Sequence, residues 1–256
     1  MKIVIPSLGR SETILTHRLL NDYLVCVPDS EHDLYARTIP GDHLIAHPDR
    51  VLGIAPKLNW ILDNVPDDEC IVILDDDIKC MYDLTVTPGQ KYSTSKITRP
   101  ELVEAIIYNT YQMAHQAGVY YFGWAMRIAL AYYSDLSPFK LTGYINRSSC
   151  GLINGHGLRF EERLTANADY DMALQNAQKH RMVWCDTRYG FDYKDTFVGA
   201  GGGSMLRSSE THKRDLQFLK EKWGDHIRIG HFLGGTGKGN KREYADRQRI
   251  RIWLPY

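Results

Sequence analysis

The chain has 256 residues, of which 43% are hydrophobic and 11% aromatic, so it can bury a large core as one α/β domain. Its 31 basic residues balance its 31 acidic residues. No overall charge therefore indicates nucleic acid, a membrane or an acidic substrate as a partner, and any such preference must be local.

The cysteines are odd in number and scattered: Cys26, Cys70, Cys80, Cys150 and Cys185. They form no C-x-x-C pair and no zinc-knuckle spacing, so reduced structural thiols are expected. Residues 1–8 carry no basic leader or cleavage site, and no apolar run approaches the ~20 residues needed to cross a bilayer. A soluble cytoplasmic protein that makes no membrane contact is expected.

The first part of the chain alternates short apolar runs with turns. Residues 2–6 and 23–27 predict buried strands, and residues 43–46 predict a third. Residues 55–62 have apolar side chains at helical spacing, and residues 71–74 form the clearest buried strand. Strand, helix and strand in this order favour a mainly parallel sheet flanked by helices.

The middle of the chain begins with a polar stretch at residues 85–98 that indicates an exposed loop. A helix with an apolar stripe is predicted from near Pro100 to Gly118. Residues 120–133 are aromatic and predict strands, and residues 151–157 predict a loop punctuated by glycines.

The last part of the chain predicts two helices, at residues 169–180 and 209–223, the second stopped by Gly224. A short strand is predicted at residues 182–185. Residues 199–204 predict a flexible glycine loop, and a glycine-rich basic tail ends the sequence.

Three consecutive carboxylates, Asp75, Asp76 and Asp77, follow the strand predicted at residues 71–74. Open parallel sheets place their ligand crevice at the carboxyl ends of strands. Neighbouring like charges repel, and a divalent cation compensates them while its free sites take phosphate oxygens. The alternative is that one aspartate caps the following turn and the others are solvated, but capping leaves two carboxylates unexplained.

At these residues the chain resembles the GT-A glycosyltransferases, whose D-x-D motif follows a buried strand in the first third of the chain. The run IVIPSLGR at residues 3–10 is similar to the opening strand and nucleotide loop of that family. The run YLVCVPD at residues 23–29 looks like its second strand. Lys57 and Asn59 stand where the family has a basic residue and an Asn.

The resemblance implies a GT-A-like, single-domain α/β enzyme that takes a UDP-sugar. Residues 1–84 would form its nucleotide-sugar half and residues 85–256 its acceptor half. Asp75 would face the ribose or uracil, and Asp77 would bind Mn²⁺ or Mg²⁺ bridging the diphosphate. The residues implied to bind the nucleotide-sugar are Pro6, Ser7, Gly9, Arg10, Asp29, Lys57, Asn59, Asp75 and Asp76.

Further along, the run ADYDMAL at residues 168–174 resembles the acidic motif that opens a helix beside the acceptor in inverting members. Asp169 takes the place of the catalytic carboxylate, although the family usually has Glu-Asp where this chain has Ala168-Asp169. Such a carboxylate could accept the proton of a reacting hydroxyl. The alternative is a stabilising role in the first helical turn, which is expected for Asp171.

His231 resembles the late histidine that completes the metal site in many GT-A enzymes, and a packed or surface histidine is the alternative. The glycine runs at residues 199–204 and 234–239 lack the dinucleotide and P-loop patterns. Both are interpreted either as loops that close over the donor or as plain surface linkers.

Residues 238–251 carry six basic residues against two acidic ones. Phosphate binding through Lys238, Lys241 and Arg242, to the donor or to a nucleic acid, and a solvated terminus both remain open. With this build the chain resembles phage glycosyltransferases that decorate hydroxymethylated pyrimidines in DNA, including those associated with TET-like oxygenases. This narrower resemblance implies DNA as the acceptor and the host cytoplasm as the location.

Two other functions are considered. A nucleotidyltransferase that makes nucleotide-sugars is disfavoured because Gly9 and Arg10 are not part of a long glycine-rich loop. A non-catalytic nucleic-acid-binding protein would leave the three aspartates without a purpose.

Overall fold

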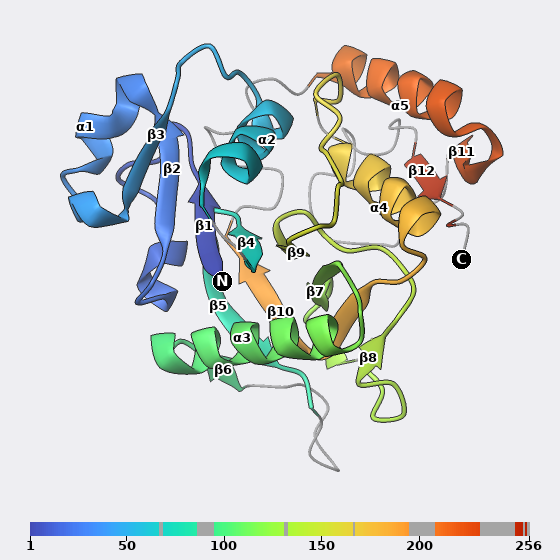
Figure 1. Cartoon of the computed structure of the whole chain (residues 1–256), viewed down its shortest axis with the longest axis horizontal. Coiled ribbons are helices and arrows are strands. Elements are labelled where there is room, and N and C mark those ends of the chain that lie inside the picture. Colours follow the sequence, from blue (N-terminus) through green and yellow to red (C-terminus); the bar gives the residue numbers. More distant parts are fainter. Residues whose placement is uncertain are drawn as a thin grey trace.

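A computed structural model of the chain describes residues 1–66, 69–85, 95–130, 133–165, 167–194, 208–230, 249–252 and 254. A central sheet of ten strands carries helices on both faces (Figure 1). Its strands are β1 Lys2–Pro6, β2 Leu24–Pro28, β3 Leu44–His47, β4 Cys70–Leu74, β5 Ile78–Asp83, β6 Lys96–Ile97, β7 Tyr121–Ala125, β8 Phe139–Lys140, β9 Ser149–Ile153 and β10 Trp184–Tyr193. The α-helices are α1 His32–Tyr35, α2 Ile54–Asn64, α3 Pro100–Gln116, α4 Ala168–Lys179 and α5 Ser209–Trp223. A separate pair is formed by β11 Ile227–Gly230 and β12 Arg249–Ile252.

The sheet runs in the order β3-β2-β1-β4-β9-β7-β10-β5-β6, and β8 also pairs with β10. The four neighbouring strands β3, β2, β1 and β4 are parallel to one another. Strand β9 is antiparallel to both β4 and β7, and β7 is parallel to β10. The strands β1, β2, β3, β4, β7 and β10 therefore point the same way and share one carboxyl edge. The α/β class predicted from the sequence, with a mainly parallel sheet between helices, is confirmed.

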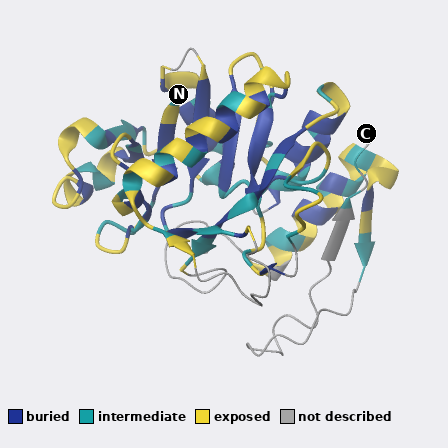
Figure 2. Ribbon diagram, turned by 90° about the horizontal axis from the view of Figure 1, so that it is seen from below, coloured by how far each residue is buried: buried dark blue, intermediate teal, exposed yellow. Residues whose placement is uncertain are grey.

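Alternate residues of the central strands build two cores, one on each face of the sheet. Ile3 and Ile5 of β1 pack with Ile107 of α3 on one face. Val4 packs with Met172 of α4, and with residues of α2 and α5, on the other. Figure 2 shows the strands as a buried layer with exposed positions on the outer sides of the helices. Period-two apolar patterning thus gives a three-layer arrangement.

The long helices lie where the apolar periodicity predicts them. The predicted helix at residues 209–223 is α5, whose first turn is closed by a capping box between Ser208 and Thr211. Gly224 ends it with a φ of 55°, which only glycine adopts without strain. Helix α3 begins at Pro100, and Gly118 follows its end with a φ of 69°.

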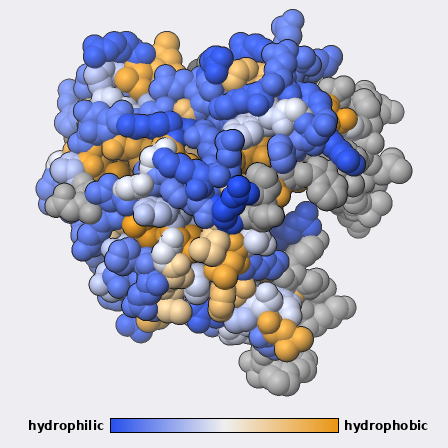
Figure 3. Space-filling model, turned by 45° about the vertical axis from the view of Figure 1, so that its right-hand side comes forward, coloured by the Kyte–Doolittle hydropathy of each residue, from blue (hydrophilic) through white to orange (hydrophobic). Residues whose placement is uncertain are grey.

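None of the five cysteines forms a disulfide, and all but Cys185 are buried. In the described parts of the chain, none of the helices is both long and apolar enough for a membrane span. The face seen in Figure 3 is mostly hydrophilic, with smaller hydrophobic patches between the polar areas.

The glycine loop predicted at residues 151–157 is partly wrong, because residues up to Ile153 belong to β9. Gly151 lies opposite Phe122 of β7 in the middle of the sheet, and a Cβ placed on it would lie 2.0 to 2.6 Å from the Phe122 ring. Glycine here makes room for an aromatic ring and does not mark a turn. The strand predicted at residues 182–185 is the start of the longer β10.

Gly151→Ala is therefore expected to overpack the core and to lower the free energy of unfolding by about 1–3 kcal/mol. That change corresponds to a fall in Tm of roughly 2–12 °C for a domain of this size, measured by thermal denaturation. Gly41→Ala is the matched control, because nothing lies within 4 Å of the added Cβ. An unchanged Tm for Gly151→Ala would contradict the close packing of β7 and β9.

Candidate active site

The carboxyl edge of the parallel strands gathers polar side chains from distant parts of the sequence. Strand β1 leads into Ser7, and β4 leads into the aspartates. Ser7 Oγ donates a hydrogen bond to Asp76 Oδ2 at 2.5 Å, and Arg10 Nη1 lies 2.5 Å from Asp76 Oδ1. Burial raises the pKa of Asp76, while the hydrogen bond from Ser7 and the charge of Arg10 oppose that rise.

Two further side chains, those of Lys57 and Tyr35, hold the loop after β1. Lys57 of α2 is buried and donates from Nζ to the Ser7 carbonyl at 2.6 Å. The Tyr35 hydroxyl lies 2.6 Å from Ser7 Oγ and accepts from the Arg10 amide at 3.0 Å. Burial lowers the pKa of Lys57. These bonds tie the predicted nucleotide loop to α1 and α2.

Asp75 is paired with an arginine that the sequence reasoning did not select. Arg147 Nη1 and Nη2 lie 3.1 and 3.3 Å from the two Asp75 carboxylate oxygens, a bidentate pair. The Asp75 amide donates to the Ser148 carbonyl at 2.8 Å. Burial disfavours the charged guanidinium, but the carboxylates of Asp75 and Asp169 outweigh it and raise the pKa of Arg147.

Asp77 has the weakest compensation of the three aspartates. Arg10 Nη1 lies 3.6 Å from Asp77 Oδ2, farther than it lies from Asp76. Burial, with repulsion from Asp75 and Asp76, raises the pKa of Asp77 from 3.8 to about 6. Mg²⁺ in proteins often takes one or two carboxylates together with substrate phosphates. The Asp77 carboxylate, which has no positive partner closer than 3.6 Å among the described residues, fits such a divalent cation.

The predicted metal ligand His231 lies outside the described residues, as do Lys238, Lys241, Arg242 and the glycine runs at 199–204 and 234–239. Within the described part of the chain, His, Cys, Asp and Glu side chains form no group of three or more that could hold a metal ion by itself. Substrate oxygens would have to complete the coordination of a cation at Asp77.

Asp169 lies in the first turn of α4 and faces the same edge. The Tyr144 hydroxyl donates to Asp169 Oδ2, and the Tyr170 amide donates to Asp169 Oδ1 at 3.0 Å. Burial raises the pKa of Asp169, and the Tyr144 hydroxyl and the Arg147 charge offset part of the rise. Since Arg147 also pairs with Asp75, the structure brings the predicted base close to the aspartate cluster.

The remaining predicted donor-binding residues differ in their surroundings. Pro6 is buried at the end of β1, and the Gly9 amide donates to the Glu31 carboxylate at 2.8 Å. Asp29 is exposed just after β2. The Asn59 amide bonds to the Phe160 backbone at 2.9 and 3.0 Å and to Glu162, so its contacts hold a loop and do not reach the aspartates.

Asp171 does more than favour the start of a helix. It is fully buried, and its carboxylate accepts from the Trp223 indole at 2.6 Å and from Gln175 at 2.5 Å. Lys222 Nζ lies 2.8 Å from the same carboxylate. The end of α5 thereby fixes the first turn of α4, which carries Asp169.

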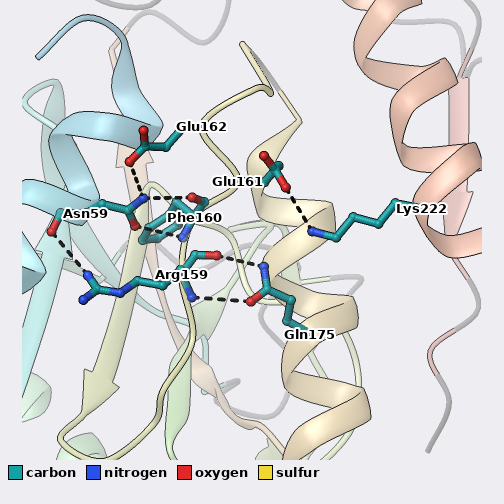
Figure 4. Close-up of a pocket in the computed structure, with 7 residues that line it drawn as sticks. All are labelled: Asn59, Arg159, Phe160, Glu161, Glu162, Gln175 and Lys222. Carbon is teal, nitrogen blue, oxygen red and sulfur yellow. Dashed lines mark hydrogen bonds and ion pairs between the residues drawn. The ribbon is translucent and has the colours of Figure 1, made fainter.

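A separate open pocket of about 450 Å³ lies between α2, α4, α5 and the loop at residues 159–162 (Figure 4). Its lining residues are Asn59, Arg159, Phe160, Glu161, Glu162, Gln175 and Lys222. Lys222 donates to Glu161 at 3.2 Å, and Arg163 binds the same carboxylate through Nε and Nη2 at 2.8 and 2.9 Å. These polar groups satisfy one another's hydrogen-bonding capacity, so we interpret the pocket as a structural contact between helices and not as a ligand site.

Sequence reasoning missed Tyr35, Tyr144 and Arg147. Tyr144 and Arg147 stand in an irregular stretch without periodicity, so no local pattern distinguishes them from surface residues. Tyr35 lies in a single helical turn and reaches Ser7 only because β1 and β2 are neighbours. The contacts of these three residues join positions 25 to 72 residues apart, which a single sequence does not reveal.

A family model described as TET-Associated Glycosyltransferase matches residues 1–202, which include the aspartate cluster, Arg147 and Asp169. The protein is therefore a glycosyltransferase. It belongs to the TET-associated glycosyltransferase family, which confirms the resemblance found in the sequence. No curated protein matches the chain.

Several solved structures are similar to the chain at low sequence identity. Glucosyl-3-phosphoglycerate synthase from Mycobacterium tuberculosis, solved with Mg²⁺ and UDP, is 10% identical over 99% of this chain and 86% of its own, with a TM-score of 0.48. A197 from STIV is 11% identical over 77% and 87% of the two chains, with a TM-score of 0.40. A CMP:2-keto-3-deoxy-manno-octonic acid synthetase solved with CTP is 14% identical over 86% and 98%, with a TM-score of 0.38.

The network in the separate pocket predicts a pH-dependent stability. The hydrogen bonds from Arg163, with those from Lys222, lower the pKa of Glu161 from 4.5 to about 2. The folded state thus favours the ionised form, so this contribution is complete above about 4.5 and is lost as the pH falls toward about 2. Glu161→Gln should lower the free energy of unfolding by about 0.5–1 kcal/mol near neutral pH, and the difference should disappear in acid.

Denaturation curves of the two proteins across a pH series provide the measurement. Glu101→Gln, on α3 at the opposite face of the sheet, controls for the loss of an exposed carboxylate. A stability difference that is the same at every pH would mean that the charge of Glu161 does not stabilise its contacts with Arg163 and Lys222.

Proposed function

We propose that the protein transfers a sugar from a UDP-sugar to an acceptor hydroxyl with the help of a divalent cation at the carboxyl edge of its sheet. The observation that supports this most directly is the position of Asp77. Its carboxylate is largely buried beside two others, with Arg10 no nearer than 3.6 Å and a pKa raised to about 6. Within a glycosyltransferase family, a divalent cation bound with a diphosphate would supply the missing positive charge.

Donor binding is assigned to the loop after β1 and to the neighbouring carboxylates. In the proposal Pro6, Ser7, Gly9 and Arg10 receive the nucleoside and the diphosphate, together with Asp29, Asp75 and Asp76. Lys57 and Asn59 contribute by holding the neighbouring loops. The loop after β1 is held by Lys57 and Tyr35 through their contacts with Ser7. Preorganised contacts of this kind reduce the entropy lost on binding. Asp77 holds the cation, and His231 is proposed as its second protein ligand.

Asp169 is proposed as the general base. The acceptor oxygen forms a bond to the anomeric carbon as the bond from that carbon to the diphosphate breaks, and the acceptor proton passes to Asp169. Burial raises the pKa of Asp169, which makes its carboxylate a stronger base than an exposed aspartate. Its closeness to Arg147, the partner of Asp75, supports a shared site for donor and acceptor.

Asp77→Asn is expected to abolish sugar transfer and to leave the fold intact, because β4 supplies the core and the Asp77 carboxylate does not. Manganese with UDP, each at about 100 times its Kd, should raise the Tm of the unmodified protein by roughly 5–10 °C, and the manganese-dependent part of that rise should be absent in Asp77→Asn. Thermal-shift curves and a transfer assay with and without chelator measure both effects.

The matched control for that experiment is Asp63→Asn, which removes a half-exposed carboxylate from α2 away from the aspartates. It should keep both activity and the metal-dependent shift. Full transfer in chelator, or an active Asp77→Asn enzyme, would rule out the cation at this position.

We also propose that the acceptor is a hydroxymethyl group on a pyrimidine in DNA. Membership of a TET-associated family supports this, as does the excess of basic residues at positions 238–251. The base would have to leave the duplex to reach Asp169. Lys238, Lys241 and Arg242 are assigned to the DNA backbone.

Phosphate contacts release counterions, so DNA affinity should fall steeply with salt. Replacing both Lys241 and Arg242 with Ala should reduce the slope of log affinity against log salt by about 1.4–1.8 and should not change hydrolysis of the donor by water. Replacing Lys2 and Lys140, two exposed lysines elsewhere, is the charge-matched control. Transfer to a protein or a small sugar, without salt-dependent DNA binding, would contradict the DNA acceptor and leave the glycosyltransferase assignment in place.

A further inference from the structure

One short segment, residues 144–148, connects the predicted donor and acceptor carboxylates. It leads into β9, and its Ser148 carbonyl accepts from the Asp75 amide at 2.8 Å. Arg147 from this segment forms the bidentate pair with Asp75. Tyr144, three residues before Arg147 in the sequence, donates to Asp169. One element thus contacts the end of β4 and the start of α4.

The segment is held tightly against the sheet. Ile145 is fully buried, and a Cβ on Gly123 of β7 would lie 2.6 Å from its Cγ2. The Tyr144 ring lies against the Tyr170 ring with 5.3 Å between centroids. The hydroxyl of Tyr144 is therefore placed by backbone anchoring and ring packing, and little freedom remains for it to leave Asp169.

Asp169 receives a defined set of hydrogen bonds. Its Oδ2 accepts from the Tyr144 hydroxyl and its Oδ1 from the Tyr170 amide at 3.0 Å. Two donors on different oxygens fix the plane of a carboxylate. A base whose plane is fixed presents its remaining lone pairs in one direction, toward a substrate hydroxyl.

Several titratable groups face Asp169 from the elements packed against it. They are Tyr144 and Arg147 from the 144–148 segment, Tyr121 from β7, Cys150 from β9 and Tyr170 from α4. Burial raises the pKa of both Cys150 and Tyr170 to about 12, so they are neutral near pH 7, and burial also raises the pKa of Tyr121 well above its ordinary value. The charge that acts on Asp169 from this set is that of Arg147, which Asp75 shares.

We propose that Tyr144 is a positioning residue for sugar transfer. Its hydroxyl orients Asp169 and keeps the carboxylate ionised, while the positive charge of Arg147 offsets the negative charges of both Asp169 and Asp75. This proposal rests on the assignment of Asp169 as the base. The reason is the direction of the hydrogen bond. A donor to the ionised form stabilises that form, so without it the carboxylate holds its proton to a higher pH.

The test replaces Tyr144 with Phe, which keeps the ring and removes the hydroxyl. The acid limb of the kcat profile should move to higher pH, with kcat on that limb reduced roughly 10-fold, the equivalent of one hydrogen bond to a charged group. As the pH rises the rate should recover most of this loss, the remainder reflecting the lost orientation of Asp169, and KM for the UDP-sugar should stay constant. Tyr108→Phe, which removes the hydroxyl of an exposed tyrosine on α3, should leave the limb in place.

Arg147 supplies a second measurement. Arg147→Lys keeps the charge and loses the bidentate pair, so KM for the donor should rise while the acid limb stays where it is. Arg147→Gln removes the charge and should move the limb upward, as Tyr144→Phe does. This difference between the two variants would not follow from a general loss of folding.

Asp169→Asn separates the proposal from the assignment on which it rests. If Asp169→Asn keeps near-normal turnover, both fall, because Asp169 is then not the base. A 10²-fold to 10⁴-fold loss in Asp169→Asn, the usual share of a positioned base, supports that assignment. If that loss occurs and Tyr144→Phe lowers kcat equally at every pH or not at all, the positioning role of Tyr144 is overturned.

Discussion

The site depends on one electrostatic constraint, which is the gathering of carboxylates at one edge of a buried sheet. Asp75, Asp76 and Asp77 follow β4 directly, so the strand that forms the centre of the core also fixes their separation. Desolvation makes each negative charge costly, and neighbouring carboxylates add to that cost. Each aspartate therefore needs its own compensation, and the surrounding loops supply it unequally.

Compensation comes from both sides of the strand. Arg10, from the loop after β1, pairs with Asp76 at 2.5 Å, and Arg147, from the segment before β9, pairs with Asp75. Asp77 is left with the more distant contact and the raised pKa. A substrate that brings a diphosphate and a cation would complete the balance, so the same constraint would favour donor binding.

The acceptor side is held by longer-range packing. Asp171 ties the first turn of α4 to Lys222 and Trp223 at the end of α5, and Tyr144 restrains Asp169 in the same turn. Removing the charge of Asp171 would therefore disturb the fold as well as the helix start, and Asp171 is unsuited as a neutral control for Asp169. Helices distant from the reacting atoms thus contribute to the geometry of the base.

The sequence by itself determined the elements and the position of the carboxylates, because apolar periodicity and strand ends are local properties of the chain. It placed the sheet class, α5 and its stop at Gly224, and the aspartates after β4. It could not determine that Gly151 lies opposite Phe122, or that Arg147 pairs with Asp75. Those features depend on which strands become neighbours, and contacts across 29 and 72 residues form only when the sheet has assembled.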